Sequence, residues 1–118
     1  MSIKIGKNAE EKAALYLSDR GFTIVDRNVR YPFGEIDIVA REQNTLVFVE
    51  VKHRHSAELG YPYEAVTKAK QRKIILAARA YLQKLGSPMP VCRFDVVSMV
   101  GDLAHPSIEH FIDAFYVA

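Results

Sequence analysis

Residues 35–52 have the sequence EIDIVAREQNTLVFVEVK, in which two runs rich in Val, Ile and Phe flank a short polar segment. Runs of β-branched and aromatic residues of this length are typical of strands. The polar segment, residues 42–45, has the length and composition of a tight turn. The stretch therefore predicts a β-hairpin with strands over residues 35–40 and 46–52.

The register of this hairpin follows from its turn. If residues 43–44 form a two-residue loop, the strands pair symmetrically about it and Asp37 lies opposite Glu50; a four-residue loop about the same centre gives the same pairing. Opposed Cβ atoms are about 4.5–5.5 Å apart, so two carboxylates there repel each other unless a cation lies between them. Lys52 points to the same sheet face, roughly 6.6 Å further along the strand. The arrangement resembles a divalent-metal site beside a lysine.

An ordinary surface ion pair between Glu50 and Lys52, with Asp37 as an exposed acid, is the alternative explanation. Such pairs contribute little to stability. However, the strand face that carries Glu50 also carries Leu46 and Phe48, so both faces of this strand begin apolar. Charged side chains on a buried strand are usually paired or metal-bound, and we therefore favour a functional site.

The length of 118 residues, with 49% hydrophobic and 25% charged residues, suits one compact domain over residues 1–118. The longest apolar stretches are far too short to span a membrane, and the N-terminus lacks the apolar core of a signal peptide. We therefore expect a cytoplasmic protein with no membrane partner. Cys92 has no second cysteine with which to form a disulfide, and we expect it to pack on a strand.

The net charge of +2 is too small to indicate a nucleic-acid partner by itself. The basic residues are nevertheless clustered, in one short segment and directly after the hairpin: Lys68, Lys70, Arg72, Lys73, His53 and Arg54. A basic rim beside an acidic centre would suit a polyanion such as DNA. Solvated lysines on a helix surface explain the segment equally well, and both explanations stay open.

Apolar spacing predicts two helices. The first covers residues 8–20, and Glu10 begins its buried stripe, so this carboxylate points inward. Its charge either favours the helix dipole at a first turn or contributes to a site. The second helix has Thr67 as its N-cap and ends near residue 85. Gln71 lies at the edge of the buried face of this helix, where its amide needs a partner.

Three further segments have strand character: residues 22–25, 93–99 and 108–116, the last of which is a strand or a short helix. Residues 26–30 lead from the first of these to the turn before the hairpin. Asp95 is expected to be structural, because acids on strands often pair locally. In the loop over residues 54–64, Tyr61 and Tyr63 either anchor the loop to the core, which we favour, or stack on bases.

Five blocks of this sequence resemble the YraN family in their residues, order and spacing: residues 6–10, 34–37, 48–54, 67–72 and 93–96. Members of that family are described as predicted endonucleases similar to archaeal Holliday junction resolvases. The resemblance spans nearly the whole chain. It implies an α/β fold, a restriction-endonuclease-like mixed β-sheet core flanked by helices, within the PD-(D/E)XK nuclease superfamily.

The resemblance also implies roles for single residues. Asp37 matches the metal-binding acid, Glu50 the second acid, and Lys52 the lysine that orients or activates water. Glu10 matches an acid on the first helix, and Gln71 matches a glutamine that lies near the site in related nucleases. One departure is that isoleucine precedes Asp37 where the superfamily name has proline, as in many other members.

The implied reaction is hydrolysis of DNA phosphodiesters, including those of branched DNA, with Mg²⁺ or Mn²⁺ held by Asp37, Glu50 and the carbonyl of Val51. Hard cations prefer such oxygen ligands and lower the pKa of bound water. Lys52 would stabilise developing charge. Resolvases of related fold act as dimers, so the resemblance includes a homodimer, although no segment identifies an interface.

A non-cleaving nucleic-acid-binding or scaffold protein on an inherited nuclease fold is the second hypothesis. The intact trio of Asp37, Glu50 and Lys52 favours the enzyme. Without a metal, the opposed acids destabilise the fold, so a site that had lost its function would be expected to lose a charge.

Overall fold

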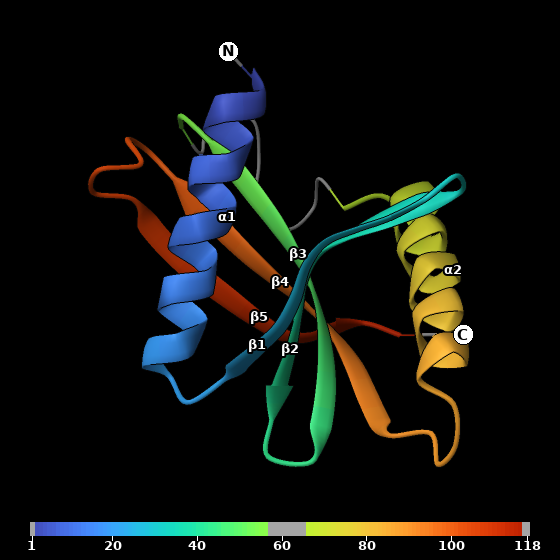
Figure 1. Cartoon of the computed structure of the whole chain (residues 1–118). Helices are drawn as coiled ribbons and strands as arrows, with labels where there is room; N and C mark the ends of the chain where they lie inside the picture. The colour runs from blue at the N-terminus through green and yellow to red at the C-terminus, as the bar shows by residue number, and fades with distance from the viewer. Residues whose placement is uncertain (1, 57–65, 117–118) are drawn as a thin grey trace.

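The computed structural model describes residues 2–56 and 66–116, with side chains from residue 8 onward. The described elements are α1 (Ser2–Asp19), β1 (Thr23–Tyr31), β2 (Gly34–Glu42), β3 (Thr45–Arg54), α2 (Lys68–Leu85), β4 (Val91–Val100) and β5 (Ser107–Phe115). The strands form one sheet in the order β1-β2-β3-β4-β5, in which β3 and β4 are parallel and the other neighbours antiparallel (Figure 1). This mixed sheet with its two helices confirms the expected α/β fold and is consistent with a restriction-endonuclease-like core.

The hairpin predicted from residues 35–52 is present in the predicted register. β2 and β3 pair continuously from a two-residue loop at residues 43–44 as far as Ile38 and Val49. Pairs on either side of such a short loop are fixed by it, and a shift of one residue would turn every side chain to the opposite face. The expected orientation of both strands is therefore confirmed.

Beyond this ladder, β2 leaves β3 and continues as part of a second hairpin with β1. β1 and β2 pair out to Tyr31 and Gly34, whereas β2 and β3 stop pairing before Asp37. Figure 1 shows the tip of this second hairpin extending over the start of α2. A Cβ atom at Gly34 would collide with the carbonyl oxygen of Lys73 on α2, so glycine permits the close approach. Asp37 consequently lies where the two strands separate.

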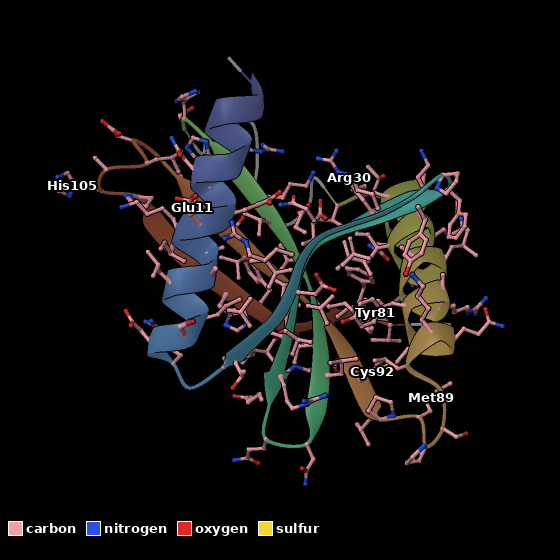
Figure 2. The ribbon with its side chains drawn as sticks, in the orientation of Figure 1. Glu11, Arg30, Tyr81, Met89, Cys92 and His105 are labelled. Atoms are coloured by element: carbon pink, nitrogen blue, oxygen red, sulfur yellow. The ribbon has the colours of Figure 1, made fainter. Side chains whose placement is uncertain are left out.

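One helix covers each face of the sheet. The apolar stripe expected for α1 is buried, and that expected for α2 packs on the sheet except at its last residue, Leu85, which is 50% exposed. On one face, α1 packs small side chains against the sheet: Ala9, Ala13, Ala14 and Leu17 contact a cluster that includes Ile38, Val47, Val49, Val97 and Met99. On the other face, α2 packs larger ones: Ile74, Ala77, Ala78, Tyr81 and Leu82 contact a cluster that includes Phe48, Phe94, Val96 and Phe115. Figure 2 shows Tyr81 between α2 and the sheet. Full burial of a side chain such as Phe48 stabilises the fold by about 1.5–3 kcal/mol.

The ends of α2 match their sequence signals. The Thr67 hydroxyl accepts a hydrogen bond of 3.1 Å from the amide of Lys70, which confirms the predicted N-cap. At the other end, the Gly86 amide donates to the Leu82 carbonyl at a positive φ of 81°, a conformation that favours glycine. The first helix was expected over residues 8–20, but α1 begins at Ser2. Its first turns contain lysines and Gly6, which do not continue the apolar stripe that identified the helix.

The prediction for β1 was wrong in its extent. A strand ending at residue 25 and a connection over residues 26–30 were expected, but β1 continues to Tyr31. The strand is irregular, with a register shift between Ile24 and Asp26 and a left-handed φ of 53° at Asn28. Polar residues on an edge strand with a bulge hide the alternation that identifies strands.

The last segment is the strand β5, which decides between the two alternatives for residues 108–116. Cys92 on β4 is half-buried and packs against the core on the α2 side, as expected. Most of the loop predicted over residues 54–64, including Tyr61 and Tyr63, lies outside the described residues. Neither described helix is long and apolar enough to cross a membrane.

Asp95 lies in a buried network on β4, away from the separating strands. Its carboxylate accepts hydrogen bonds from Arg93 at 2.9 Å, from His110 at 2.8 Å and from the amide of Asp113 at 3.0 Å. These partners lower the pKa of Asp95, although burial opposes them. The expected structural role of Asp95 is confirmed, because its partners come from β4 and β5 and hold those strands together.

Candidate active site

A cleft of about 460 Å³ lies where β2 separates from β3. It is lined by residues from four elements: Ala9, Glu10, Glu35, Asp37, Glu50, Val51, Lys52, His53 and Lys70, together with His55 just after β3. Four of the residues singled out from the sequence as catalytic therefore share one cavity. α1 contributes from one side and α2 from the other, because the separated strands leave this end of the sheet open.

Asp37 is held toward β3 by the backbone. Its Oδ2 accepts a hydrogen bond of 2.8 Å from the amide of Val51. This amide lies beyond the end of the β2–β3 ladder, and the carboxylate supplies the acceptor that a neighbouring strand would otherwise provide. Burial raises the pKa of Asp37, while the Val51 amide and a hydrogen bond with Glu50 oppose the rise.

Glu50 is almost completely buried, with 4% of its side chain exposed. Its Oε2 lies 3.4 Å from the Lys52 ammonium and 3.8 Å from the Lys70 ammonium, whereas its Oε1 is buried without a hydrogen-bond partner. Burial and the charge of Asp37 raise the pKa of Glu50 to about 8, although both lysines lower it. Two cations on one oxygen therefore do not compensate this carboxylate fully.

Glu10 faces the same carboxylates from α1. Its Oε1 is also buried without a hydrogen-bond partner. Burial and then the charge of Asp37 raise the pKa of Glu10, while Arg27 and Asn28 lower it. The inward direction predicted from the sequence is confirmed. The dipole explanation is not, because α1 begins at Ser2 and the dipole acts mainly within the first turn.

The cleft groups three carboxylates whose negative charge is not fully compensated by the protein. Their pKa values are all raised, and one oxygen each of Glu10 and Glu50 is buried without a partner. Such a group of uncompensated anions is stabilised by a positive ion. Among the side chains of residues 8–56 and 66–116, however, no three His, Cys, Asp or Glu groups converge on a single point. The ligand set would therefore need backbone carbonyl, water or phosphate oxygens as well, which is the manner in which Mg²⁺ is usually bound.

Comparison with known proteins assigns the family. A family model described as "Uncharacterised protein family UPF0102" matches residues 9–99. The chain belongs to the UPF0102 family. A UPF0102 protein of Chlorobium limicola is 47% identical over 118 residues, covering 95% of this chain and 92% of the relative. Another, from Symbiobacterium thermophilum, is 50% identical over 99 residues and covers 84% of each chain.

A third UPF0102 protein, from Rhodococcus jostii, is 47% identical over 115 residues, covering 97% of this chain and 98% of the relative. UPF0102 is the family also called YraN, so the family resemblance seen in the sequence is confirmed. The names of these relatives give the family and no activity, so membership alone assigns no reaction.

The basic residues at the end of β3 lie close to the cleft in this UPF0102 protein. His53 and His55 line the cleft, and their rings meet edge to face with centroids 5.2 Å apart. The Nε2 of His53 lies 2.8 Å from the carbonyl of Gly101, so this nitrogen carries the proton. The carbonyl of Arg54 accepts from the Gly101 amide at 2.8 Å. These contacts fix the end of β3 to the turn after β4.

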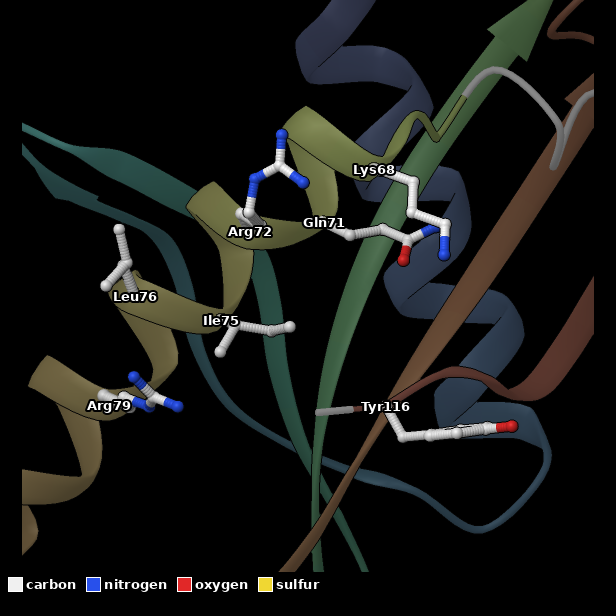
Figure 3. A pocket seen from close by; sticks show the side chains of 7 residues that line it. All are labelled: Lys68, Gln71, Arg72, Ile75, Leu76, Arg79 and Tyr116. Atoms are coloured by element: carbon white, nitrogen blue, oxygen red, sulfur yellow. The ribbon is translucent and has the colours of Figure 1, made fainter. Parts of the chain in front are cut away.

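The basic cluster of α2 is divided between two sides of the helix. Lys70 lines the cleft, whereas Lys68, Gln71 and Arg72 line a separate groove that Figure 3 shows with Tyr116. The Gln71 amide donates to the carbonyl of Val66 at 3.0 Å, which is the partner that its position required. The structure does not bring Gln71 into the carboxylate cleft, and its catalytic role stays a prediction.

Two features of the site were missed from the sequence. Lys70 was read as part of a basic rim, but its ammonium group lies beside Glu50. The amide of Val51 was not foreseen as the group that orients Asp37. A signal for Lys70 existed, since a crossover helix begins near the end of the strand that it follows. No sequence pattern marks the point at which two paired strands separate.

Proposed function

We propose that this protein is a divalent-metal-dependent endonuclease that hydrolyses phosphodiester bonds of branched or otherwise structured DNA. One observation carries the proposal: Glu50 is buried beside Asp37 with an oxygen that has no hydrogen-bond partner. A buried, uncompensated pair of acids destabilises a fold. A bound cation that also acts on a phosphate would explain why two acids are buried together, whereas packing alone does not explain it.

Each residue of the cleft has a distinct part in the proposal. Asp37 and Glu50 would hold Mg²⁺ or Mn²⁺ together with the carbonyl of Val51. The bound ion would polarise the phosphate and lower the pKa of a water molecule. Lys52, whose ammonium lies 3.4 Å from Glu50, orients that carboxylate and can stabilise negative charge that develops on the phosphate.

Glu10 and Lys70 act at the two sides of the cleft. The free oxygen of Glu10 can accept a hydrogen bond from water and so position it. Lys70 lies 3.8 Å from Glu50 with part of its side chain exposed, which allows it to contact a phosphate that enters from the α2 side. His53, which lines the cleft, and Arg54 at the end of β3 are proposed to bind the DNA backbone together with Lys68, Arg72 and Lys73 on α2.

The test is cleavage of plasmid DNA and of a four-way junction, each with Mn²⁺, with Mg²⁺ and with EDTA. Asp37→Asn and Lys52→Ala should abolish metal-dependent cutting. The matched controls Asp19→Asn and Lys84→Ala change exposed residues at the ends of the two helices and should cut normally. Cutting that persists in Asp37→Asn would contradict the proposal.

The second candidate, a nucleic-acid-binding scaffold, predicts a different result in the same experiment. It would bind DNA in every condition and cut in none. Two symmetric cuts of a four-way junction require two active sites, so the enzyme proposal also includes a homodimer. Light scattering of the protein with and without a junction measures that state directly.

A further inference from the structure

The tip of the β1–β2 hairpin carries two stacked aromatic rings. The rings of Tyr31 and Phe33 lie nearly parallel, at 7°, with centroids 5.4 Å apart. Tyr31 packs against the core on its other side, whereas Phe33 is 45% exposed. One side of the Phe33 ring is therefore covered by Tyr31, while a large part of the ring stays accessible to a ligand.

The tip is held in place. Gly34 lies against the backbone of Lys73 so closely that no side chain would fit between the hairpin and α2. Since Tyr31 is also packed against the core, Phe33 is stacked on a ring whose position is fixed. Fixed aromatic rings bind flat ligands with little loss of conformational entropy.

The surroundings of the rings are mainly cationic. Arg30, Lys70 and Lys73 line a recess of about 400 Å³ together with Tyr31, Phe33 and Glu35. Glu35 is the single acid among them, and its ion pair with Arg30 is long, at 3.6 Å, and largely exposed. Figure 2 shows Arg30 at this tip. An accessible aromatic ring beside three cationic side chains suits a nucleotide, which has a flat base and an anionic phosphate.

The recess adjoins the carboxylate cleft. Glu35 and Lys70 line both cavities. A DNA strand that has one phosphate at the carboxylates can therefore place a neighbouring nucleotide at the rings of Tyr31 and Phe33. A base within an intact duplex has both faces covered by its neighbours, whereas an unpaired base at a branch has a free face.

We propose that the hairpin tip binds an unpaired base of the DNA by stacking it on Phe33, with Arg30 and Lys73 on the adjoining phosphates. The tip thereby selects DNA in which an unpaired nucleotide adjoins a duplex, such as a fork or an open junction. This inference rests on the proposed function for its ligand class, and it concerns a site that is separate from the carboxylates.

The test measures binding without cleavage. Fluorescence anisotropy in EDTA compares a forked DNA that has two unpaired arms with a fully paired duplex of the same length. Phe33→Ala should weaken binding of the fork about tenfold, the effect of losing one base stack, and change duplex binding less than twofold. Phe33→Tyr should bind like the wild type. Leu15→Ala, which removes an apolar side chain that is 65% exposed on α1, is the matched control and should change neither affinity.

Three results would overturn the inference. Phe33→Ala could leave fork binding unchanged, it could weaken fork and duplex equally, or it could dissociate a dimer without changing DNA affinity. The last result would identify the tip as a protein interface. Because EDTA removes the metal, these outcomes are independent of catalysis. A protein that binds forks through Phe33 but cuts no DNA would refute the proposed nuclease and leave the base-binding tip in place.

Discussion

The carboxylate of Asp37 accepts a hydrogen bond of 2.8 Å from the backbone amide of Val51, one residue beyond Glu50 on the neighbouring strand. The contact replaces a ladder hydrogen bond at the point where β2 and β3 separate. It also brings the carboxylate of Asp37 close to that of Glu50, so the two acids repel each other when both are charged. The stability of the metal-free protein therefore depends on these two residues.

Above about pH 8, where both acids are charged, replacing Asp37 by Asn should raise the melting temperature of the metal-free protein by roughly 4–8 °C, which corresponds to about 1 kcal/mol in a domain of similar size. The amide oxygen can still accept from Val51, while the charge that repels Glu50 is lost. Differential scanning calorimetry in EDTA measures the change, and Asp19→Asn is the exposed control. A lower melting temperature than that of the wild type would contradict the repulsion.

The stability of the metal-free protein should fall as the pH rises, because of Glu50. Its pKa is raised from 4.5 to about 8, so the protonated form is favoured by folding and the stabilisation is lost as the pH rises through about 8. Glu50→Gln stays neutral throughout. The melting temperature of the wild type should therefore drop relative to that of Glu50→Gln between about pH 5 and pH 9. A constant difference would show that Glu50 is charged at every pH.

Glu10 should contribute to metal affinity, since its free oxygen faces the acids of β2 and β3. We expect Glu10→Gln to weaken Mn²⁺ binding about 10-fold, at the lower end of the range for residues around a metal. Electron paramagnetic resonance of free Mn²⁺ gives the affinity without any DNA. Glu11→Gln changes the exposed neighbour on α1 and should bind Mn²⁺ normally. Equal affinities of both variants would remove Glu10 from the site.

Gly34→Ala should destabilise the protein by about 1–3 kcal/mol, because its Cβ would collide with the backbone of Lys73 and the hairpin would have to shift. Urea unfolding measures the loss of free energy. Pro32→Ala, at the exposed turn beside it, is the control and should cost much less. A neutral Gly34→Ala variant would mean that the hairpin tip is free to move away from α2.

Asp95→Asn should destabilise the fold by about 3–5 kcal/mol, since it leaves Arg93 and His110 without their buried partner. The cleft is formed by other residues, so Mn²⁺ affinity of the folded variant should remain that of the wild type. Urea unfolding and Mn²⁺ titration test the two statements separately. Reduced affinity in the fully folded variant would show that this network supports the cleft.

The sequence was sufficient for the β2–β3 hairpin and for the two helices, since each has regular apolar spacing and a clear end signal. Two residues at its turn fixed the register, and the register brought Asp37 and Glu50 to one end. The strand predicted for β1 was too short, because the bulge of β1 and its left-handed residue Asn28 interrupt the alternation of polar and apolar residues. Local pattern identifies an element only where the element is regular.

The rest of the site depends on contacts between distant parts of the chain. Lys70 meets Glu50 because α2 begins beside the end of β3, and the stacked rings of Tyr31 and Phe33 lie beside the cleft because the hairpin extends over α2. Neither relationship is encoded in the spacing of neighbouring residues. Glu10 was an intermediate case: its direction followed from helical periodicity, but its carboxylate neighbours did not.

The parallel pairing of β3 with β4 has a consequence during synthesis of the chain. A parallel pair cannot close through a tight turn, so the connection between them is the helix that supplies Lys70. When the ribosome has released only α1 and the first three strands, the acids of the cleft have been synthesised, but Lys70 and the neighbouring strand β4 have not. A growing chain would therefore hold the acids of the cleft in an incomplete sheet, and the site would be complete only after the second half of the sheet has formed.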